Sequence, residues 1–244
     1  MKIDQKTNAL LANLSPEERI NWVIQHISPK IVLSSSFGAQ SAVMLHMATK
    51  IKKDIPVILI DTGYLFKETY QFIDDLTKRL GLNLKVFRNH ISPAWQEARY
   101  GKLWQKGLDG IHQYNELNKV VPMQNALNEL ESEVWMVGLR RSQSEERSKM
   151  QFLSNQDNRY KLLPILDWSN KDIHVYLKKH NLPYHPLWEK GYVSIGDTHT
   201  TKPLSEDISE NETRFFGLTR ECGLHVNPLH GSAEQLNNSI YNNS

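Results

Sequence analysis

Cysteine is almost absent from this sequence, with one residue, Cys222, in a chain of 244. A single thiol cannot form a disulfide within the chain, and unpaired thiols are typical of the reducing cytoplasm. No apolar run approaches the ~20 residues that a membrane-spanning helix needs. The opening stretch, MKIDQKTNAL, lacks the charged-then-apolar order of a secretory signal. We therefore expect a cytoplasmic protein without a membrane partner.

A large excess of charge of one sign is also missing. The chain has 29 Lys and Arg against 27 Asp and Glu, a net charge of +2. This is too small for the continuous basic face of a nucleic-acid-binding protein, so no nucleic-acid partner is expected. The basic residues are clustered instead, in GLRRSQSEERSK (residues 138–149) and TRECGLH (residues 219–225). Clustered arginines suit a small anion such as a phosphate.

Internal repeats are absent, and short apolar runs alternate with helical patterns along most of the chain. The patterns predict helices over residues 7–26, 39–51, 66–81, 122–132 and 167–181, and strands over residues 31–34, 57–60, 83–89, 134–139 and 160–166. Residues 91–118 give no clear assignment. This alternation predicts an α/β fold: a mostly parallel, Rossmann-like sheet with helices on both faces. We expect residues 1–205 to form this domain and residues 206–244 to form a mobile tail with a disordered end.

Three polar segments follow predicted strands, where ligands bind in parallel sheets. SSSFGAQS (residues 34–41) offers backbone N–H groups and hydroxyls to an anion, or a serine simply caps the following helix. It lacks the lysine of a Walker A loop. DTG (residues 61–63) is a plain turn or lies under a ribose or leaving group. GLRR (residues 138–141) is a solvated turn or an anion clamp.

The serine loop resembles the S-G-G-x-D-S loop of the ATP pyrophosphatase superfamily, which holds the phosphates of an adenine nucleotide. Gln40 replaces the Asp of that pattern. The resemblance implies the adenine nucleotide alpha hydrolase fold, with a loop that holds a nucleotide without cleaving ATP. Residues 1–205 are then a nucleotide-binding domain. The residues expected to line its cleft are Ser34, Ser35, Ser36, Phe37 and Gly38, with Asp61 and Gly63 opposite.

The lone thiol lies in a stretch with little aliphatic bulk to bury it. A lone cysteine is more often a buried filler than a nucleophile. Here Arg220 and His225 would lower the pKa of the Cys222 thiol, whereas Glu221 opposes them. A nucleophilic role is therefore favoured.

Five motifs together, ECGLH, SSSFG, DTGYLF, GLRR and GDTHTT, resemble the assimilatory phosphoadenylyl-sulfate (PAPS) reductases over residues 31–225. The resemblance implies an oxidoreductase of sulfate assimilation and cysteine biosynthesis. It would make sulfite and adenosine 3′,5′-bisphosphate from PAPS, with thioredoxin or glutaredoxin as electron donor. It also implies a homodimer.

A related class acts on adenylyl sulfate and carries an iron–sulfur cluster on the patterns C-C-x-x-R-K-x-x-P-L-x-x-A-L and C-x-x-C. In this chain Tyr114 and Asn115 replace the paired cysteines, and Asp197 and Thr200 replace the later two. Such clusters need thiolate ligands, and one cysteine cannot supply them. We therefore expect no iron–sulfur cluster, no metal and no other bound cofactor.

The resemblance and the electron count lead to one mechanistic hypothesis. The Cys222 thiolate attacks the sulfur of PAPS and forms S-sulfocysteine. Because a single thiol supplies half of a disulfide, a dithiol of thioredoxin must then expel sulfite. An anion that attacks an anionic sulfo group needs positive charge nearby. The residues expected to supply it are Lys119, Arg140 and Arg141, with Arg220 and His225 from the tail.

Two further assignments stay open. His199 either donates to a sulfonate oxygen or is a structural loop histidine. Trp95 and Trp104 belong to the core, to a subunit interface or to a docking surface for thioredoxin.

Three alternatives to the hypothesis also stay open. They are an adenylyl-sulfate reductase without a cluster, an ATP pyrophosphatase or adenylyltransferase on the same fold, and a non-catalytic nucleotide-binding or thiol-sensing protein. Substrate preference, pyrophosphate release and alkylation of Cys222 distinguish them.

Overall fold

A computed structural model describes residues 3, 5–205, 207, 210–219 and 223–224. Its centre is a six-stranded sheet in the order β3-β2-β1-β4-β6-β5. The strands are β1 Ile31–Ser34, β2 Pro56–Ile60, β3 Asn83–Phe87, β4 Val134–Val137, β5 Leu153–Gln156 and β6 Arg159–Leu162. All neighbouring pairs run parallel except β5 with β6, which is antiparallel. The predicted α/β fold with a mostly parallel sheet is confirmed.

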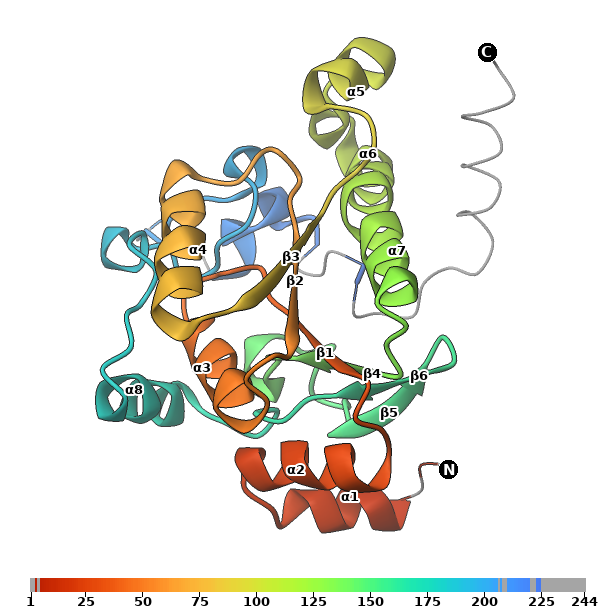
Figure 1. Cartoon of the computed structure of the whole chain (residues 1–244). Helices are drawn as coiled ribbons and strands as arrows, with labels where there is room; N and C mark the ends of the chain where they lie inside the picture. The colour runs from red at the N-terminus through yellow and green to blue at the C-terminus, as the bar shows by residue number, and fades with distance from the viewer. Residues whose placement is uncertain (1–2, 4, 206, 208–209, 220–222, 225–244) are drawn as a thin grey trace.

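Helices cover both faces of this sheet. They are α1 Gln5–Ala12, α2 Pro16–His26, α3 Ala42–Ile51, α4 Lys67–Leu80, α5 Pro93–Tyr100, α6 Gly107–Asn115, α7 Val121–Glu129 and α8 Asn170–Lys179. Figure 1 shows α3, α4 and α8 on one side of the sheet and α7 on the other. Among the described residues, no helix is both long and apolar enough to cross a bilayer.

Local sequence explains where several helices begin and end. The Ser15 side chain caps α2 in a reciprocal capping box with Glu18, and Pro16 fits the first turn. Ser169 caps α8 in the same manner. Gly81 ends α4 with a left-handed φ of 62°, which glycine adopts without the cost that other residues meet. The sequence predicts the cap at Ser15 and the stop at Gly81, and a cap at Asp167 or Ser169 for α8. The structure confirms the first two and shows that Ser169 is the cap of α8.

The chain departs from the predicted elements in three places. Residues 7–26 form two helices, because the chain turns before the cap at Ser15. The strand expected over residues 160–166 is shorter and pairs in a hairpin with β5, which the sequence pattern did not indicate. Residues 91–118 are mostly helical, and a π-helical turn (η2, Glu116–Val120) joins α6 to α7 without a break.

The order of the strands places a topological switch point beside β1. Strands β2 and β3 lie on one side of β1 and β4 lies on the other. The connections that leave the carboxyl ends of β1 and β4 therefore run in opposite directions. Such a switch point is where ligands bind in open α/β sheets. The serine loop follows β1 and GLRR follows β4, so both segments flank this point.

Candidate active site

The serine loop connects β1 to α3 through a strained turn. Phe37 has a positive φ of 50°, which is uncommon for a non-glycine residue, and its side chain is fully buried. Its backbone N–H donates to the Ser35 hydroxyl at 3.1 Å. The Phe37 side chain thus anchors the loop in the core, whereas the neighbouring Ser36 is exposed. The strain is typical of sites where the backbone is held ready for a ligand.

Two serines of this loop have distinct environments. The Ser34 hydroxyl accepts a hydrogen bond from the indole N–H of Trp135 on β4 at 2.7 Å, which joins β1 to β4 at the switch point. The Ser41 hydroxyl is buried beside the start of α3 and has no hydrogen-bond partner among the described residues. A small hydroxyl at the start of a helix lies at the positive end of the helix dipole, which suits an anionic group. Ser41 is therefore a further candidate ligand.

The two arginines of GLRR are held by other parts of the protein. The buried Arg140 guanidinium donates to Asn170 Oδ1 at 2.9 Å and to Gln40 Oε1 at 2.8 Å. Arg140 therefore connects the serine loop to the start of α8. Arg141 donates from Nε and Nη2 to the Met150 carbonyl and lies over the Phe152 ring. Gln40, which replaces the Asp of the pyrophosphatase pattern, has become an acceptor for Arg140.

The DTG turn after β2 is ordered by its own carboxylate. Asp61 Oδ1 accepts from the Gly63 N–H at 2.9 Å and from the Tyr70 hydroxyl at 2.7 Å. Gly63 has a φ of 75°, and a Cβ at this position would lie 2.5 Å from Pro93 Cγ. Only glycine fits here, because both the conformation and the space exclude a side chain.

Residues 195–201 run past both of these loops. The Ile195 carbonyl lies 3.7 Å from the position of a Cβ on Gly38. The Thr198 N–H donates to the Tyr64 carbonyl at 2.9 Å, and Asp197 forms a β-bridge with Leu65. The structure thus gathers the serine loop, the DTG turn and GDTHTT at one edge of the sheet.

A buried ion pair lies in the middle of this edge. Lys119 Nζ, on η2, is 2.7 Å from Asp197 Oδ2, and the Thr62 hydroxyl donates to Asp197 Oδ1 at 2.5 Å. Burial alone would raise the pKa of Asp197. The charge and hydrogen bond of Lys119 and the hydrogen bond of Thr62 outweigh it and lower this pKa to about 2. Asp197 is therefore ionised at any physiological pH.

Aromatic rings surround the ion pair. His199 lies 3.8 Å from Trp104, 4.8 Å from Tyr64 and 5.1 Å from Tyr114, measured between ring centroids. Burial lowers the pKa of His199 to about 4, so its imidazole is neutral. Both ring nitrogens are buried without a hydrogen-bond partner among the described residues. Trp104 belongs to this cluster, whereas Trp95 on α5 is 55% exposed.

Two residues of this site stand at positions where the related adenylyl-sulfate reductases carry the cysteine ligands of their iron–sulfur cluster. Tyr114 and Asn115 were matched to its paired cysteines, and Asp197 and Thr200 to its later two. Tyr114 and Asp197 do meet here: the charge of Asp197 contributes, after burial, to raising the pKa of Tyr114. Within the described part of the chain, no group of three or more His, Cys, Asp or Glu side chains could hold a metal ion.

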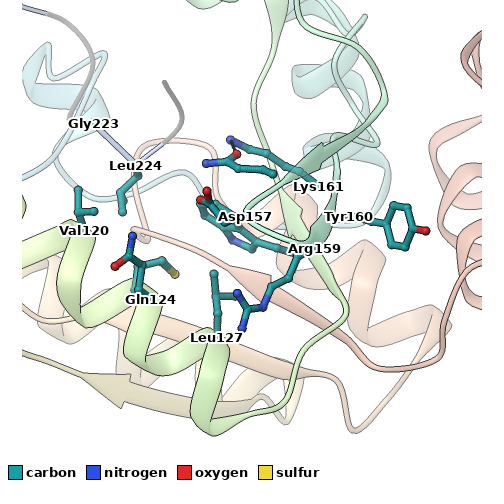
Figure 2. A pocket seen from close by; sticks show the side chains of 12 residues that line it. Val120, Gln124, Leu127, Asp157, Arg159, Tyr160, Lys161, Gly223 and Leu224 are labelled. Carbon is teal, nitrogen blue, oxygen red and sulfur yellow. Dashed lines mark hydrogen bonds between the residues drawn. The ribbon is translucent and has the colours of Figure 1, made fainter. Parts of the chain in front are cut away.

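Gly223 and Leu224 are the described residues next to the position of Cys222. These two residues line a pocket between α7 and the β5–β6 hairpin, together with Val120, Gln124, Arg159 and Trp135. Figure 2 shows Leu224 beside Val120 and Gln124, while Tyr160 points away. Trp135 links this pocket to Ser34. Cys222, Arg220 and His225 lie outside the described residues, so their assignments stay predictions, as does the division of the chain at residue 205.

Comparison with known proteins decides the family. The phosphoadenosine phosphosulfate reductase domain matches residues 30–203. The chain belongs to the phosphoadenosine phosphosulfate reductase family. The phosphoadenosine 5′-phosphosulfate reductase of Zymomonas mobilis is 60% identical over 220 residues, 90% of either chain. That of Vibrio vulnificus is 61% identical over 218 residues, 89% of this chain and 84% of the relative. The prediction that the chain belongs to a family of oxidoreductases acting on sulfur is confirmed.

Solved structures place the fold in the same group. The crystal structure of phosphoadenylyl-sulfate reductase from Candida auris, a phosphate complex, superposes with a TM-score of 0.71 at 27% identity. The match covers 83% of this chain and 99% of that one. FMN adenylyltransferase from Candida glabrata superposes with a TM-score of 0.58 at 16% identity, over 96% of this chain and 79% of that one. This second likeness concerns the fold alone and agrees with the predicted α/β sheet.

Some residues that build the site were missed by sequence reasoning. The serine loop is held by Trp135, and Asp197 is held by Thr62. Arg140 is held by Asn170. Trp135 and Thr62 lie in or beside strand patterns, and Asn170 starts a helix. No local signal marks such residues, because their partners are distant in the sequence.

Proposed function

We propose that this protein reduces 3′-phosphoadenylyl sulfate to sulfite and adenosine 3′,5′-bisphosphate, with a dithiol protein of the thioredoxin or glutaredoxin type as electron donor. The observation that carries the proposal is the identity of about 60% over nine-tenths of the chain to reductases named for this substrate. The gathering of the serine loop, the DTG turn and a buried lysine at one edge supports it.

Two displacements at sulfur would complete the reaction. The Cys222 thiolate attacks the sulfur of the sulfo group. An S–S bond forms, the S–O bond to the phosphate breaks, and the bisphosphate leaves with the electron pair. A thiolate of the donor protein then attacks Cys222 Sγ and expels sulfite. The second donor thiol resolves the mixed disulfide, so the donor is oxidised by the two electrons that sulfate gains.

The described residues would bind and orient the nucleotide in this scheme. The serine loop, with the unpartnered Ser41 hydroxyl and the start of α3, offers donors to a phosphate. The DTG turn lies on the adjoining strand β2. Lys119 supplies positive charge at the same edge. No acidic side chain stands at position 40, which is consistent with a loop that holds a nucleotide without a magnesium-assisted cleavage of ATP.

The decisive experiment follows sulfite release from PAPS with reduced thioredoxin. We expect Cys222→Ser to abolish turnover and to leave the binding of adenosine 3′,5′-bisphosphate unchanged, because the thiol acts on sulfur and not on the nucleotide. Mass spectrometry of the wild-type enzyme without donor should show an added sulfo group on the tail peptide. Sulfite release at a near-normal rate by Cys222→Ser would refute the scheme. Adenylyl sulfate as a parallel substrate tests the alternative specificity.

A further inference from the structure

The Lys119–Asp197 pair is arranged differently from an ordinary structural ion pair. The Asp197 side chain is 2% exposed, whereas that of Lys119 is 10% exposed. The carboxylate of the pair is therefore enclosed, and the Lys119 side chain is the partner that keeps some contact with solvent. Asp197 is also anchored on its other oxygen by Thr62, two residues beyond the end of β2.

Apolar and aromatic groups form the remaining walls around the ammonium. Lys119 Nζ lies 5.3 Å from the Tyr114 ring centroid and 5.0 Å from that of Phe215. These ring faces attract a cation and exclude water. An ammonium enclosed in this way needs a fixed counter-charge, because a charge that loses its hydration is costly unless it is paired. Asp197 supplies that counter-charge at 2.7 Å.

Other basic residues of this edge are engaged elsewhere. Arg140 donates to Gln40 and Asn170, and Arg141 donates to the Met150 carbonyl. Arg214 packs against Gly196 and donates to the Ser194 hydroxyl. Lys119 is the basic residue that Asp197, anchored by Thr62 just beyond the end of β2, holds directly.

We propose that Asp197 is a positioning residue for sulfur transfer: it fixes the Lys119 ammonium where the sulfo group reacts. This inference rests on the proposed function and assigns to Asp197 a role that acts only through Lys119. The carboxylate does not touch the substrate. It sets the position of the group that does.

Asp197→Asn is the direct test. The amide keeps the size and keeps an oxygen for Thr62, but it turns an N–H₂ group toward the ammonium. Two donors then face each other, and Lys119 moves away. We expect kcat to fall about 10- to 100-fold with a small change in KM, because the ammonium matters most where negative charge develops in the transition state.

A double-variant cycle separates positioning from simple structural support. Lys119→Met should lose activity at least as strongly as Asp197→Asn. In the combined variant the loss should equal that of Lys119→Met alone, because Asp197 has nothing left to position. The combined variant also removes the unpaired buried carboxylate, so it remains foldable if Lys119→Met alone does not. Multiplicative losses in the combined variant, or an unchanged kcat in folded Asp197→Asn, overturn the inference.

Asp167→Asn is the matched control. Asp167 forms the ion pair with buried Arg19 at 2.7 Å, and it has no contact with Lys119 or Asp197. The Asp167→Asn variant should have a lower free energy of unfolding and an unchanged kcat. If the wild-type protein releases no sulfite from PAPS, the proposed function fails. If the wild type is active and Asp197→Asn matches it, only the positioning role fails.

Discussion

Arg140 was predicted to bind the substrate, but in the structure its guanidinium connects the serine loop to the start of α8. Substitution of Arg140 tests whether this connection stabilises the protein. Arg140 is 5% exposed and donates one hydrogen bond to Gln40 and one to Asn170. In Arg140→Ala both acceptors lose a charged donor. A hydrogen bond to a charged group contributes about 1.5–3 kcal/mol. Since Gln40 is half-buried and water can replace part of the loss, we expect the free energy of unfolding to fall by about 3–4 kcal/mol.

Urea unfolding followed by circular dichroism measures this loss. We expect a lower midpoint with an unchanged slope, because the same surface is exposed on unfolding. Arg140→Lys retains the charge but reaches one acceptor at a time, so it should lose roughly half as much. Arg99→Ala is the control, because Arg99 is exposed and should change stability by no more than about 0.5 kcal/mol.

Activity gives a second, independent readout of the same variant. If Arg140 acts by holding the serine loop, Gln40→Ala should lower kcat/KM in the same direction as Arg140→Ala. A loss of stability below about 1 kcal/mol in Arg140→Ala would refute the structural role. A large loss of kcat/KM without that loss of stability would instead place the guanidinium on the substrate.

Two further outcomes are expected. Burial lowers the pKa of His185 to about 4; its Nδ1 accepts from the Leu187 N–H and its Nε2 pairs with the Thr69 hydroxyl. Because the unfolded chain then binds more protons between about pH 4 and 6.5, His185 should contribute about 1–2 kcal/mol to the fall in the free energy of unfolding as pH drops through this window. Denaturation of His185→Gln should show a flatter pH dependence, and an equal slope would contradict the assignment. Gly63→Ala should cost about 1–3 kcal/mol through its positive φ and its clash with Pro93, whereas Gly81→Ala, with a similar φ and open space, should cost less in the same thermal-unfolding assay.

Much of the fold is determined by local sequence. The apolar run at residues 31–34 is β1 with the predicted bounds, and the caps at Ser15, Ser169 and Gly81 lie where the sequence indicates them. Such signals involve neighbours within a few residues, so the sequence alone carries them. The motifs that identify the family are local in the same sense.

Tertiary structure decided what those motifs contact. The sequence marks Lys119 and Arg140 as cations for the substrate, but it does not show that one pairs with Asp197 and the other with Gln40 and Asn170. These partners lie 30 to 100 positions away along the chain. Only the strand order, which brings the ends of β1, β2 and β4 to one edge, puts them within hydrogen-bonding distance. A buried charge is defined by what surrounds it, and those surroundings exist only once the chain has folded.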